Sequence, residues 1–198
     1  MPLLRVALTG GIATGKSYSL KCFEAEGIPG IDADRLAREA VAPGTAGLAA
    51  VVRRFGASVL SADGTLQRPA LAAIVFSDRS ARADLEAIIH PEVYRRIRDW
   101  FVNLPHTVTV AIADIPLLFE TGHEHDFDRV VVVACTPDEQ VRRLVRRDGL
   151  SLEAAHARLA AQWPIEEKVA RADYVIRTDG TLEETAAQVA RVAESLER

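Results

Sequence analysis

Residues 10–17 read Gly-Gly-Ile-Ala-Thr-Gly-Lys-Ser, which is a complete G-x-x-x-x-G-K-[ST] phosphate-loop motif. The apolar stretch 4–9 comes directly before it, and residues 18–26 are suited to a helix directly after it. The motif requires a strand on one side and a helix on the other, and here it has both. Residues 4–26 therefore predict the first strand, loop and helix of an α/β protein.

The residue types in this loop suit a polyphosphate. Gly10, Gly11 and Gly15 let the backbone curl with its N–H groups pointing inward, where side chains would block a phosphate group. Lys16 supplies positive charge toward the outer phosphates, Ser17 offers a hydroxyl to Mg²⁺, and the helix N-terminus adds partial positive charge. The motif predicts nucleoside triphosphate binding; the alternative is a glycine-rich turn with an exposed lysine.

Size and composition limit the class of protein. The chain has 198 residues, 48% of them hydrophobic, which fits one domain with insertions. It lacks the roughly 18 successive apolar residues of a membrane span, and the first strand leaves no room for a signal peptide. Cys22 and Cys135 match no metal or redox spacing, which indicates reduced, buried thiols in a cytoplasmic protein. A net charge of −4 argues against a nucleic-acid partner, and no pattern indicates an oligomeric state.

Apolar strands alternate with helical stretches along much of the chain. We expect further strands near 28–32, at 107–113, at 129–134 and at 174–177, and a helix at 35–42. The runs at 107–113 and 129–134 do not alternate with polar residues, as is typical of parallel strands covered on both faces. This order predicts an α/β doubly wound parallel sheet, with its ligand crevice at the carboxyl ends of the strands.

Helix-start signals divide the C-terminal half. Thr136, Pro137 and Glu139 predict a helix with a capping box, and Ser151 can cap a helix reaching about residue 162. Residues 165–172 are a further helical candidate. Thr181 and Glu184 form a second capping box, which opens the final amphipathic helix.

Residues 45–105 contain no convincing strand. We expect helices around 48–55 and 71–76 and a longer one at about 78–101, interrupted at His90-Pro91. This stretch predicts a helical insertion of roughly sixty residues.

Acidic residues follow the strands that end beside the phosphate loop. Asp32 and Asp34 come at the end of the second strand, and Asp114 follows the third. Asp34 is our first candidate for the base that takes the acceptor's proton, and Asp32 the second. Asp34 as a helix N-cap, and Asp114 as a polar strand terminator in place of a Mg²⁺ ligand acting directly or through water, are the alternatives.

Arginines gather on the helix that begins near residue 137. Arg143, Arg146 and Arg147 share one face, and such crowding of like charge is explained by a phosphate partner, as in a mobile lid that closes on ATP. The alternative is a solvated basic face. We expect Arg143 to touch the transferred phosphate.

Three other features are less specific. Glu120 is either an acceptor-side contact or a surface residue. His123 and His125 lack helical metal-ligand spacing and indicate a solvated loop. His90, inside the helical insertion, is either a packing residue or part of the site.

Along nearly its whole length, the chain resembles the dephospho-coenzyme A kinase family. The Asp-Ala-Asp at 32–34, the His-Pro at 90–91 and the Pro-Leu-Leu-Phe-Glu at 116–120 are the specific matches, whereas the phosphate loop alone is generic. The other matching stretches are 8–17, 36–38, Arg68 with Phe76, 85–89, Gln140 with Arg143, Arg147-Asp148, 160–162 and Ala172-Asp173.

The resemblance implies transfer of the ATP γ-phosphate to the ribose 3′-hydroxyl of dephospho-coenzyme A, the last step of coenzyme A synthesis. It implies a P-loop kinase core at about 1–44, 106–136 and 173–198, a helical coenzyme-binding insertion at about 45–105 and a lid at about 137–172. The residues so assigned are Thr9, Lys16, Asp34 and Arg143 for catalysis; Gly10, Gly11, Ala13, Thr14, Gly15, Lys16, Ser17, Tyr18 and Arg147 for ATP; Asp32, Arg38, His90 and Glu120 for the acceptor; and Ser17 and Asp114 for Mg²⁺.

The sequence departs from the family pattern in two places. Tyr18 follows Ser17 where the family usually has threonine, which leaves the metal ligand intact. Residues 177–180 read Arg-Thr-Asp-Gly where an Asn-x-Gly near the adenine is usual, and the chain's only asparagine is Asn103. Base recognition there must differ or rely on backbone groups.

Two other functions fit this sequence less well. Another small-molecule P-loop kinase, with a nucleoside or sugar acceptor, shares the loop, lid and base but not the three specific matches. A GTPase-type switch requires an Asp-x-x-Gly and an Asn-Lys-x-Asp, and the sequence contains neither.

Overall fold

The structure is a computed structural model that describes residues 2–198, so Met1, the first residue of the predicted core, lies outside the described range. The chain divides into two compact units. The sheet unit comprises the residues up to Asp32 together with Leu104–Arg198, and the helical unit comprises Ala33–Asn103. The helical unit contains nearly all of the predicted insertion and also includes the helix that follows Asp32.

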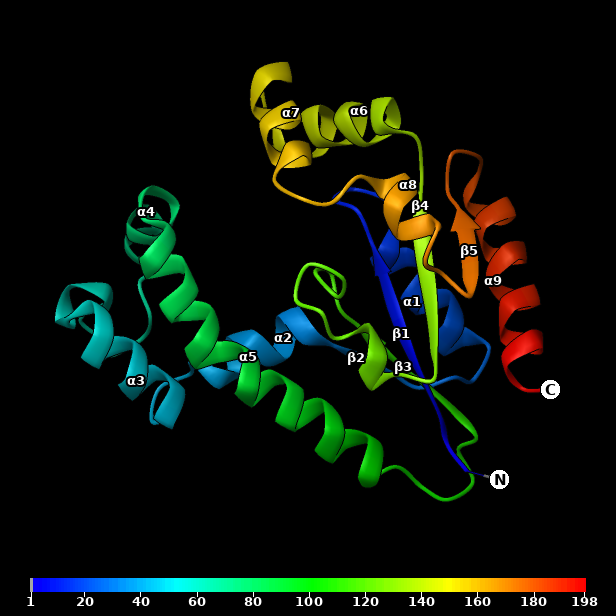
Figure 1. The fold of residues 1–198 in the computed structure, drawn as a ribbon, viewed down its shortest axis with the longest axis horizontal. Coiled ribbons are helices and arrows are strands. Elements are labelled where there is room, and N and C mark those ends of the chain that lie inside the picture. Colours follow the sequence, from blue (N-terminus) through cyan, green and yellow to red (C-terminus); the bar gives the residue numbers. More distant parts are fainter. Residues whose placement is uncertain (1) are drawn as a thin grey trace. The chain divides into compact units, whose positions relative to one another are not determined.

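The sheet unit is built on parallel strands (Figure 1). They are β1 (Leu4–Gly10), β2 (Gly30–Asp32), β3 (Val110–Asp114), β4 (Arg129–Ala134) and β5 (Tyr174–Arg177), in the order β2-β3-β1-β4-β5. Every adjacent pair is parallel. The predicted doubly wound parallel sheet is confirmed, and the chain order reverses at β1, which places a ligand crevice at its carboxyl end.

Continuous burial explains the three central strands β3, β1 and β4. All of β3 is buried, as are the last five residues of both β1 and β4. The prediction for 129–134 matches β4, whereas β3 begins three residues later than predicted. Residues 107–109 precede it outside any helix or strand, and the Val108 N–H donates to the Pro105 carbonyl at 2.9 Å.

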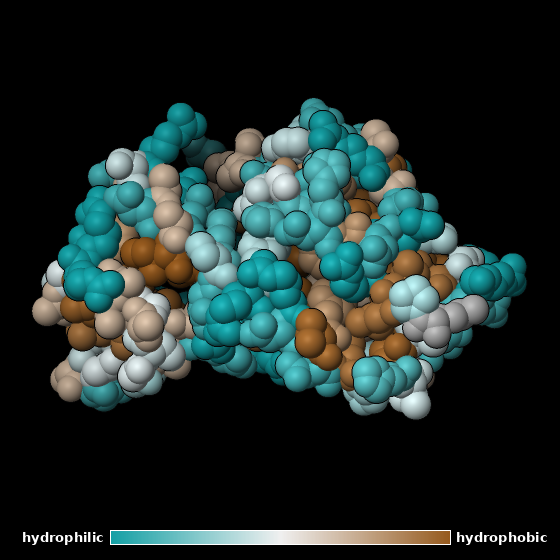
Figure 2. Space-filling view, turned by 60° about the horizontal axis from the view of Figure 1, so that its bottom comes forward, coloured by the Kyte–Doolittle hydropathy of each residue, from teal (hydrophilic) through white to brown (hydrophobic). Residues whose placement is uncertain are grey.

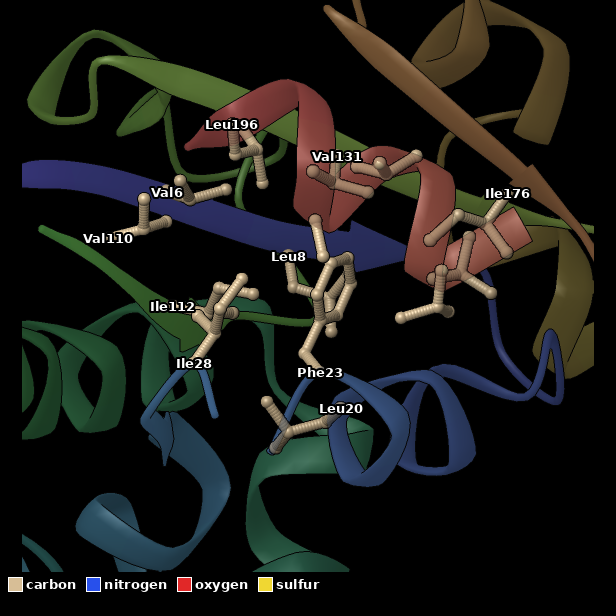
Figure 3. Close-up of a cluster of buried hydrophobic side chains, with 14 residues drawn as sticks. Val6, Leu8, Leu20, Phe23, Ile28, Val110, Ile112, Val131, Ile176 and Leu196 are labelled. Carbon is tan, nitrogen blue, oxygen red and sulfur yellow. The ribbon is translucent and has the colours of Figure 1, made fainter. Parts of the chain in front are cut away.

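Helices α1 (Lys16–Ala25) and α9 (Leu182–Leu196) pack against β1 and its neighbours. Figure 3 shows Phe23 of α1 beside Leu8 of β1, with Leu196 of α9 over the same layer. Phe23 and Leu8 are fully buried. This cluster anchors the N-terminal helix that follows the phosphate loop.

The remaining helices of the sheet unit follow β4. They are α6 (Pro137–Asp148), α7 (Leu152–Ala160) and the short α8 (Ile165–Val169), and a 3₁₀ turn at Glu124–Asp126 precedes β4. The Ser151 hydroxyl caps α7 by accepting from the Ala154 N–H at 3.1 Å, as predicted. The capping box of α9 also forms, with both reciprocal hydrogen bonds between Thr181 and Glu184.

The capping box predicted for α6 is only half formed. Thr136 accepts from the Glu139 N–H at 3.4 Å, but the Thr136 N–H donates to Asp179 Oδ1 at 2.7 Å. The Glu139 carboxylate instead pairs with Arg142 and Arg143. The prediction was wrong on this point because two arginines one turn along are stronger partners for a carboxylate than a backbone amide that Asp179 already satisfies.

Strand β5 is the last strand at one side of the sheet, and α9 contacts its exposed backbone. Gln188 accepts from the Arg177 N–H at 2.9 Å through Oε1 and donates to the Arg177 carbonyl at 2.7 Å through Nε2. One side chain therefore satisfies both main-chain groups of one edge residue.

The helical unit contains α2 (Ala33–Ala40), α3 (Ala46–Phe55), α4 (Arg68–Ser77) and α5 (Arg79–Val102), with a 3₁₀ turn at Ala57–Val59 (Figure 1). Helices α2, α3 and α4 each pack against α5. Val41, Val51, Val59 and Leu71 form its buried cluster.

The predicted interruption at His90-Pro91 was wrong, because α5 runs continuously through both residues. Proline removes one helical N–H donor and costs about 3 kcal/mol in a helix interior. Both halves of α5 carry packed side chains, with Ile88 and Ile89 before Pro91 and Val93 and Ile97 after it. Their burial outweighs the lost hydrogen bond.

Hydrophilic residues dominate the face of the molecule shown in Figure 2, and hydrophobic residues surface there in small patches. The large hydrophobic side chains that are exposed are Phe76, Val102, Leu117, Leu152 and Leu182. In the described part of the chain, no helix combines the length and apolar character that crossing a bilayer requires.

Candidate active site

The phosphate loop connects β1 to α1 with the backbone shape that the glycines predict. Gly15 has φ +89°, a left-handed conformation that disfavours other residues, and α1 starts at Lys16 directly after it. Gly10 has no room for a side chain, since an added Cβ would lie 2.4 Å from the Val133 carbonyl oxygen. The buried Thr14 donates from its hydroxyl to the Gly11 carbonyl at 2.9 Å. The loop therefore closes on itself at the open N-terminus of a helix, which is a ready anion site.

Ala13 is the one non-glycine residue with positive φ among the described residues, at 60°. Such a conformation is uncommon for a residue with a Cβ and persists only where its surroundings enforce it. The Ala13 carbonyl accepts from Arg143 Nη1 at 3.3 Å. A contact from α6 thus holds the strained residue of the loop.

Lys16 forms an ion pair with Asp114 at the end of β3. Only 14% of the Lys16 side chain and 3% of the Asp114 side chain are exposed. The Asp114 carboxylate therefore keeps the ammonium group beside the loop, where a polyphosphate offers it a second anionic partner.

Two acidic residues of the sheet unit lie at the carboxyl ends of neighbouring strands. Asp32 and Asp114 are register partners on β2 and β3, and Leu8 of β1 is the partner of Asp114 on the other side. Thr9 follows Leu8, is fully buried, and donates from its hydroxyl to the Pro116 carbonyl at 3.3 Å. The structure thus brings Thr9, Asp32 and Asp114 to the carboxyl ends of adjacent strands.

Asp34, Arg38 and His90 belong to the helical unit, the first two on α2 and the third on α5. The N-cap alternative for Asp34 was wrong, because α2 already begins at Ala33 and Asp34 lies in its first turn. Helix α2 starts directly after β2, with Ala33 buried. The proton-accepting role of Asp34 stays a prediction.

Arg143 connects three parts of the sheet unit. Its Nε donates to Glu139 at 2.6 Å, and its Nη1 donates to Ala13 of the loop and to the Thr178 hydroxyl at 3.0 Å. Its Nη2 donates to the Thr178 carbonyl. The guanidinium group therefore joins α6 to the phosphate loop and to the segment after β5, where the usual asparagine is absent.

Two other arginines of α6, Arg142 and Arg147, form ion pairs with nearby carboxylates, whereas Arg146 is exposed. Arg142 pairs with Glu139, and Arg147 pairs with Asp148 at 2.7 Å. Burial alone would raise the pKa of Glu139, but hydrogen bonds from Arg143 and Arg142 hold that pKa below its ordinary value. The Arg147 guanidinium likewise lowers the pKa of Asp148. Acidic neighbours therefore offset part of the like-charge crowding on this helix.

Glu120 is neither exposed nor isolated. Its Oε1 lies 2.6 Å from Lys168 Nζ and accepts from the Trp163 N–H at 3.1 Å. Only 15% of its side chain is exposed, so the surface alternative for Glu120 was wrong. Lys168 is fully buried.

Two glutamines contact the tip of the phosphate loop. Gln140 Nε2 donates to the Ile12 carbonyl at 2.7 Å, and Gln162 Oε1 accepts from the Ile12 N–H at 2.7 Å. Sequence reasoning gave Gln140, Gln162 and Lys168 no role. One signal was present for Lys168, since only three of the 24 basic residues are lysine.

The histidine-rich loop matches its predicted solvated character. His123 Nδ1 lies 2.7 Å from Asp126, and the His125 side chain is 91% exposed. Within residues 2–198, no group of three or more His, Cys, Asp or Glu side chains is arranged to hold a metal ion. Of the two thiols, Cys135 is buried, which raises its pKa, whereas Cys22 is only partly buried.

The parallel sheet reversing at β1, the phosphate loop at its carboxyl end and the adjoining Lys16–Asp114 pair define a phosphotransferase of the P-loop kinase class. Residues 4–184 match the family model described as dephospho-CoA kinase. The chain belongs to the dephospho-CoA kinase family.

Individual proteins agree with this assignment. A dephospho-CoA kinase of Anaeromyxobacter dehalogenans is 50% identical over 96% of this chain and 91% of its own length. The crystal structure of TT1252 from Thermus thermophilus matches with a TM-score of 0.82 and 36% identity, covering 97% of both chains. Dephospho-CoA kinase from Campylobacter jejuni matches with a TM-score of 0.73 and 28% identity, covering 97% of this chain and 96% of its own.

Proposed function

We propose that this protein transfers the γ-phosphate of ATP to the ribose 3′-hydroxyl of dephospho-coenzyme A, giving coenzyme A and ADP, the last step of coenzyme A synthesis. Its family makes it an ATP-dependent phosphotransferase. The observation that carries the proposal is the family match over residues 4–184, which contains the whole phosphate loop and its Lys16–Asp114 pair.

ATP is held by the loop residues Gly10, Gly11 and Ala13 to Tyr18. Backbone N–H groups and the N-terminus of α1 face the phosphates, and Lys16 neutralises the charge that grows on the β–γ bridging oxygen. Arg143 and Arg147 complete the ATP side from α6. Because Arg143 already contacts Ala13 and Thr178, its approach to the transferred phosphate requires α6 or the loop to rearrange.

The residues beside Lys16 fit Mg²⁺. Ser17 offers a hydroxyl in the first turn of α1, and Asp114 offers a carboxyl group that is 3% exposed and already paired with Lys16. Hard oxygen ligands of this kind, together with substrate phosphates, are what Mg²⁺ prefers. Bound there, the ion neutralises phosphate charge and helps align the β- and γ-phosphates.

The acceptor oxygen forms a bond to the γ-phosphorus, and the bond from that phosphorus to the β–γ bridging oxygen breaks, releasing ADP. Asp34 takes the proton of the 3′-hydroxyl. It follows the carboxyl end of β2 by two residues, and Thr9 lies at the carboxyl end of β1. Asp32, Arg38, His90 and Glu120 are assigned to the acceptor, although Glu120 is already engaged by Lys168 and Trp163.

The test is a coupled ATP-consumption assay with dephospho-coenzyme A, adenosine, common nucleosides and sugars offered as separate acceptors. We expect turnover with dephospho-coenzyme A and formation of a 3′-phosphate, identified by mass spectrometry. Faster turnover with a nucleoside or sugar would instead identify another small-molecule kinase. The reaction is proposed to occur in the cytoplasm, where ATP and reduced thiols coexist.

A further inference from the structure

A buried lysine lies against the first residue of the phosphate loop. Lys168 of α8 has 0% of its side chain exposed and forms an ion pair with Glu120 at 2.6 Å. Its ammonium group also donates to the Gly10 carbonyl at 3.3 Å and to the Pro116 carbonyl at 3.5 Å. Three acceptors thus surround a group with three donors.

This pair is not well arranged for stability. Burying two charges costs desolvation energy, and replacing such pairs by apolar residues is often neutral or stabilising. The second carboxylate oxygen, Glu120 Oε2, is buried with no hydrogen-bond partner among the described residues, which adds to the cost. The pair therefore calls for an explanation other than stability.

The two carbonyl groups that Lys168 contacts belong to the segments that carry the Lys16–Asp114 pair. Gly10 ends β1 and begins the loop, and Pro116 follows Asp114 by two residues. The Pro116 carbonyl also accepts from the Thr9 hydroxyl at 3.3 Å. Lys168 thereby links the two strand ends on which Lys16 and Asp114 depend.

Glu120 extends the same network to the tip of the loop. It accepts from the Trp163 N–H, and the neighbouring Gln162 accepts from the Ile12 N–H at 2.7 Å. The segment from 162 to 168 therefore contacts the N-terminal part of the loop, at both Gly10 and Ile12. Lys16 lies near the C-terminal end of the same loop.

We propose that Lys168 is a positioning residue for the nucleotide site. Lys168 holds the Gly10 carbonyl directly and holds Trp163 through Glu120. The loop is therefore ordered before ATP binds, and less conformational entropy is lost on binding. Lys168 itself contacts no substrate. The inference rests on the proposed role of residues 10–18 as the ATP site.

The central experiment compares wild type with the double variant Lys168→Met/Glu120→Gln. The single Lys168→Met would leave a buried unpaired carboxylate, whereas the double variant removes both charges and keeps an oxygen for the Trp163 N–H. We expect its melting temperature to stay within about 3 °C of wild type, which a well-matched neutral replacement allows.

The readout is ATP affinity, measured by calorimetry. We expect the Kd for ATP to rise about tenfold or more, as for the loss of one hydrogen bond from a charged donor. The control is Lys21→Met, which removes an exposed lysine of α1 and should leave that Kd unchanged. A double variant that is folded and binds ATP as tightly as wild type would overturn the proposal.

A second measurement uses the wild-type protein and does not depend on any variant folding. Acylation of Lys168 by an amine reagent requires the segment around it to open, whereas the exposed Lys21 reacts directly. If that opening disturbs the ATP site, ATP binds the closed state more tightly and lowers the population of the open state. Saturating ATP must then slow the acylation of Lys168 and leave the acylation rate of Lys21 unchanged. Equal slowing of both lysines, or no slowing of Lys168, contradicts the positioning role. Failure of wild type to bind ATP would instead refute the proposed function.

Discussion

The sheet unit contains two largely buried ion pairs, which contrast with exposed ion pairs of the helical unit. In the sheet unit, Lys16–Asp114 has side-chain exposures of 14% and 3%, and Lys168–Glu120 has 0% and 15%. In the helical unit, Arg54–Asp84 is 44% exposed on each side, and Arg95–Asp99 is 53% and 56% exposed.

The difference in exposure indicates which ion pairs contribute to ligand binding. Exposed pairs contribute about 0–1 kcal/mol, whereas buried pairs are retained against a desolvation cost. Both buried pairs named here contact the phosphate loop or the strand ends beside it. We infer that these two buried pairs organise anion binding, and that the exposed pairs keep the protein surface hydrated.

The largest effect is expected at Lys16. Lys16→Ala removes the ammonium group that faces the phosphates, so it should weaken ATP binding and lower kcat/KM by about 10³-fold, the scale of losing a charged transition-state contact. Steady-state kinetics and calorimetry measure both. The matched control is Arg53→Ala on the exposed surface of α3, and an equal loss there would remove the contrast between the units.

Core truncation probes the two apolar clusters. Phe23→Ala in the sheet unit should lower the free energy of unfolding by about 3–5 kcal/mol, and Leu71→Ala in the helical unit by about 2–5 kcal/mol. Both side chains are at least 95% buried. Urea unfolding at constant m-value checks this, and a cost below about 1 kcal/mol at either site would show that its cluster is not tightly packed.

Asp34 tests whether the helical unit contributes to the chemistry. Asp34→Asn should retain ATP affinity and lower turnover by about 10²-fold or more, because the amide cannot accept the hydroxyl proton. The control is Asp99→Asn, an exposed carboxylate on α5. Turnover equal to wild type would exclude Asp34 as the base and leave Asp32 as the candidate.

The smallest effect concerns a partly exposed cluster on α5. Hydrogen bonds from Arg95 and Arg96 lower the pKa of Glu92 to about 2. Because the folded pKa lies below the ordinary value, this stabilisation is complete above about pH 4.5 and is lost as the pH falls toward 2. Solvent screening keeps it near 0.5 kcal/mol. Wild type should exceed Glu92→Gln in unfolding free energy at pH 6, by a margin that shrinks at pH 3; a margin independent of pH would refute the titration.

The elements that local pattern determines were predictable. The apolar runs of β4 and β5, the caps at Ser151 and Thr181 and the phosphate loop are each specified within a few neighbouring residues. Pro91 misled because its local cost is outweighed by packing with α2, α3 and α4, which no short window of sequence contains.

The candidate site divides in the same way. The placement of Asp32 and Asp114 at the carboxyl ends of neighbouring strands could be predicted from the strand order, and that of Lys16 from the loop motif, whereas their roles stay predictions. The contacts of Lys168, Gln140 and Gln162 with Gly10 and Ile12 span 128 to 158 residues of chain, so they emerge only when the fold is assembled. Glu139 shows that prediction can fail even within one helix turn. Its carboxylate pairs with arginines instead of closing the capping box, because Asp179 already accepts from the Thr136 N–H.

The contact between Gln188 and Arg177 has a consequence for how the sheet ends. An outermost strand offers unpaired amides and carbonyls on which a further chain can add, the first step toward aggregation. By imitating one residue of a neighbouring strand, Gln188 occupies both main-chain groups of Arg177, the C-terminal residue of that outermost strand. Replacing it by an apolar residue of similar length would reopen a template for intermolecular β-pairing while leaving the phosphate loop untouched.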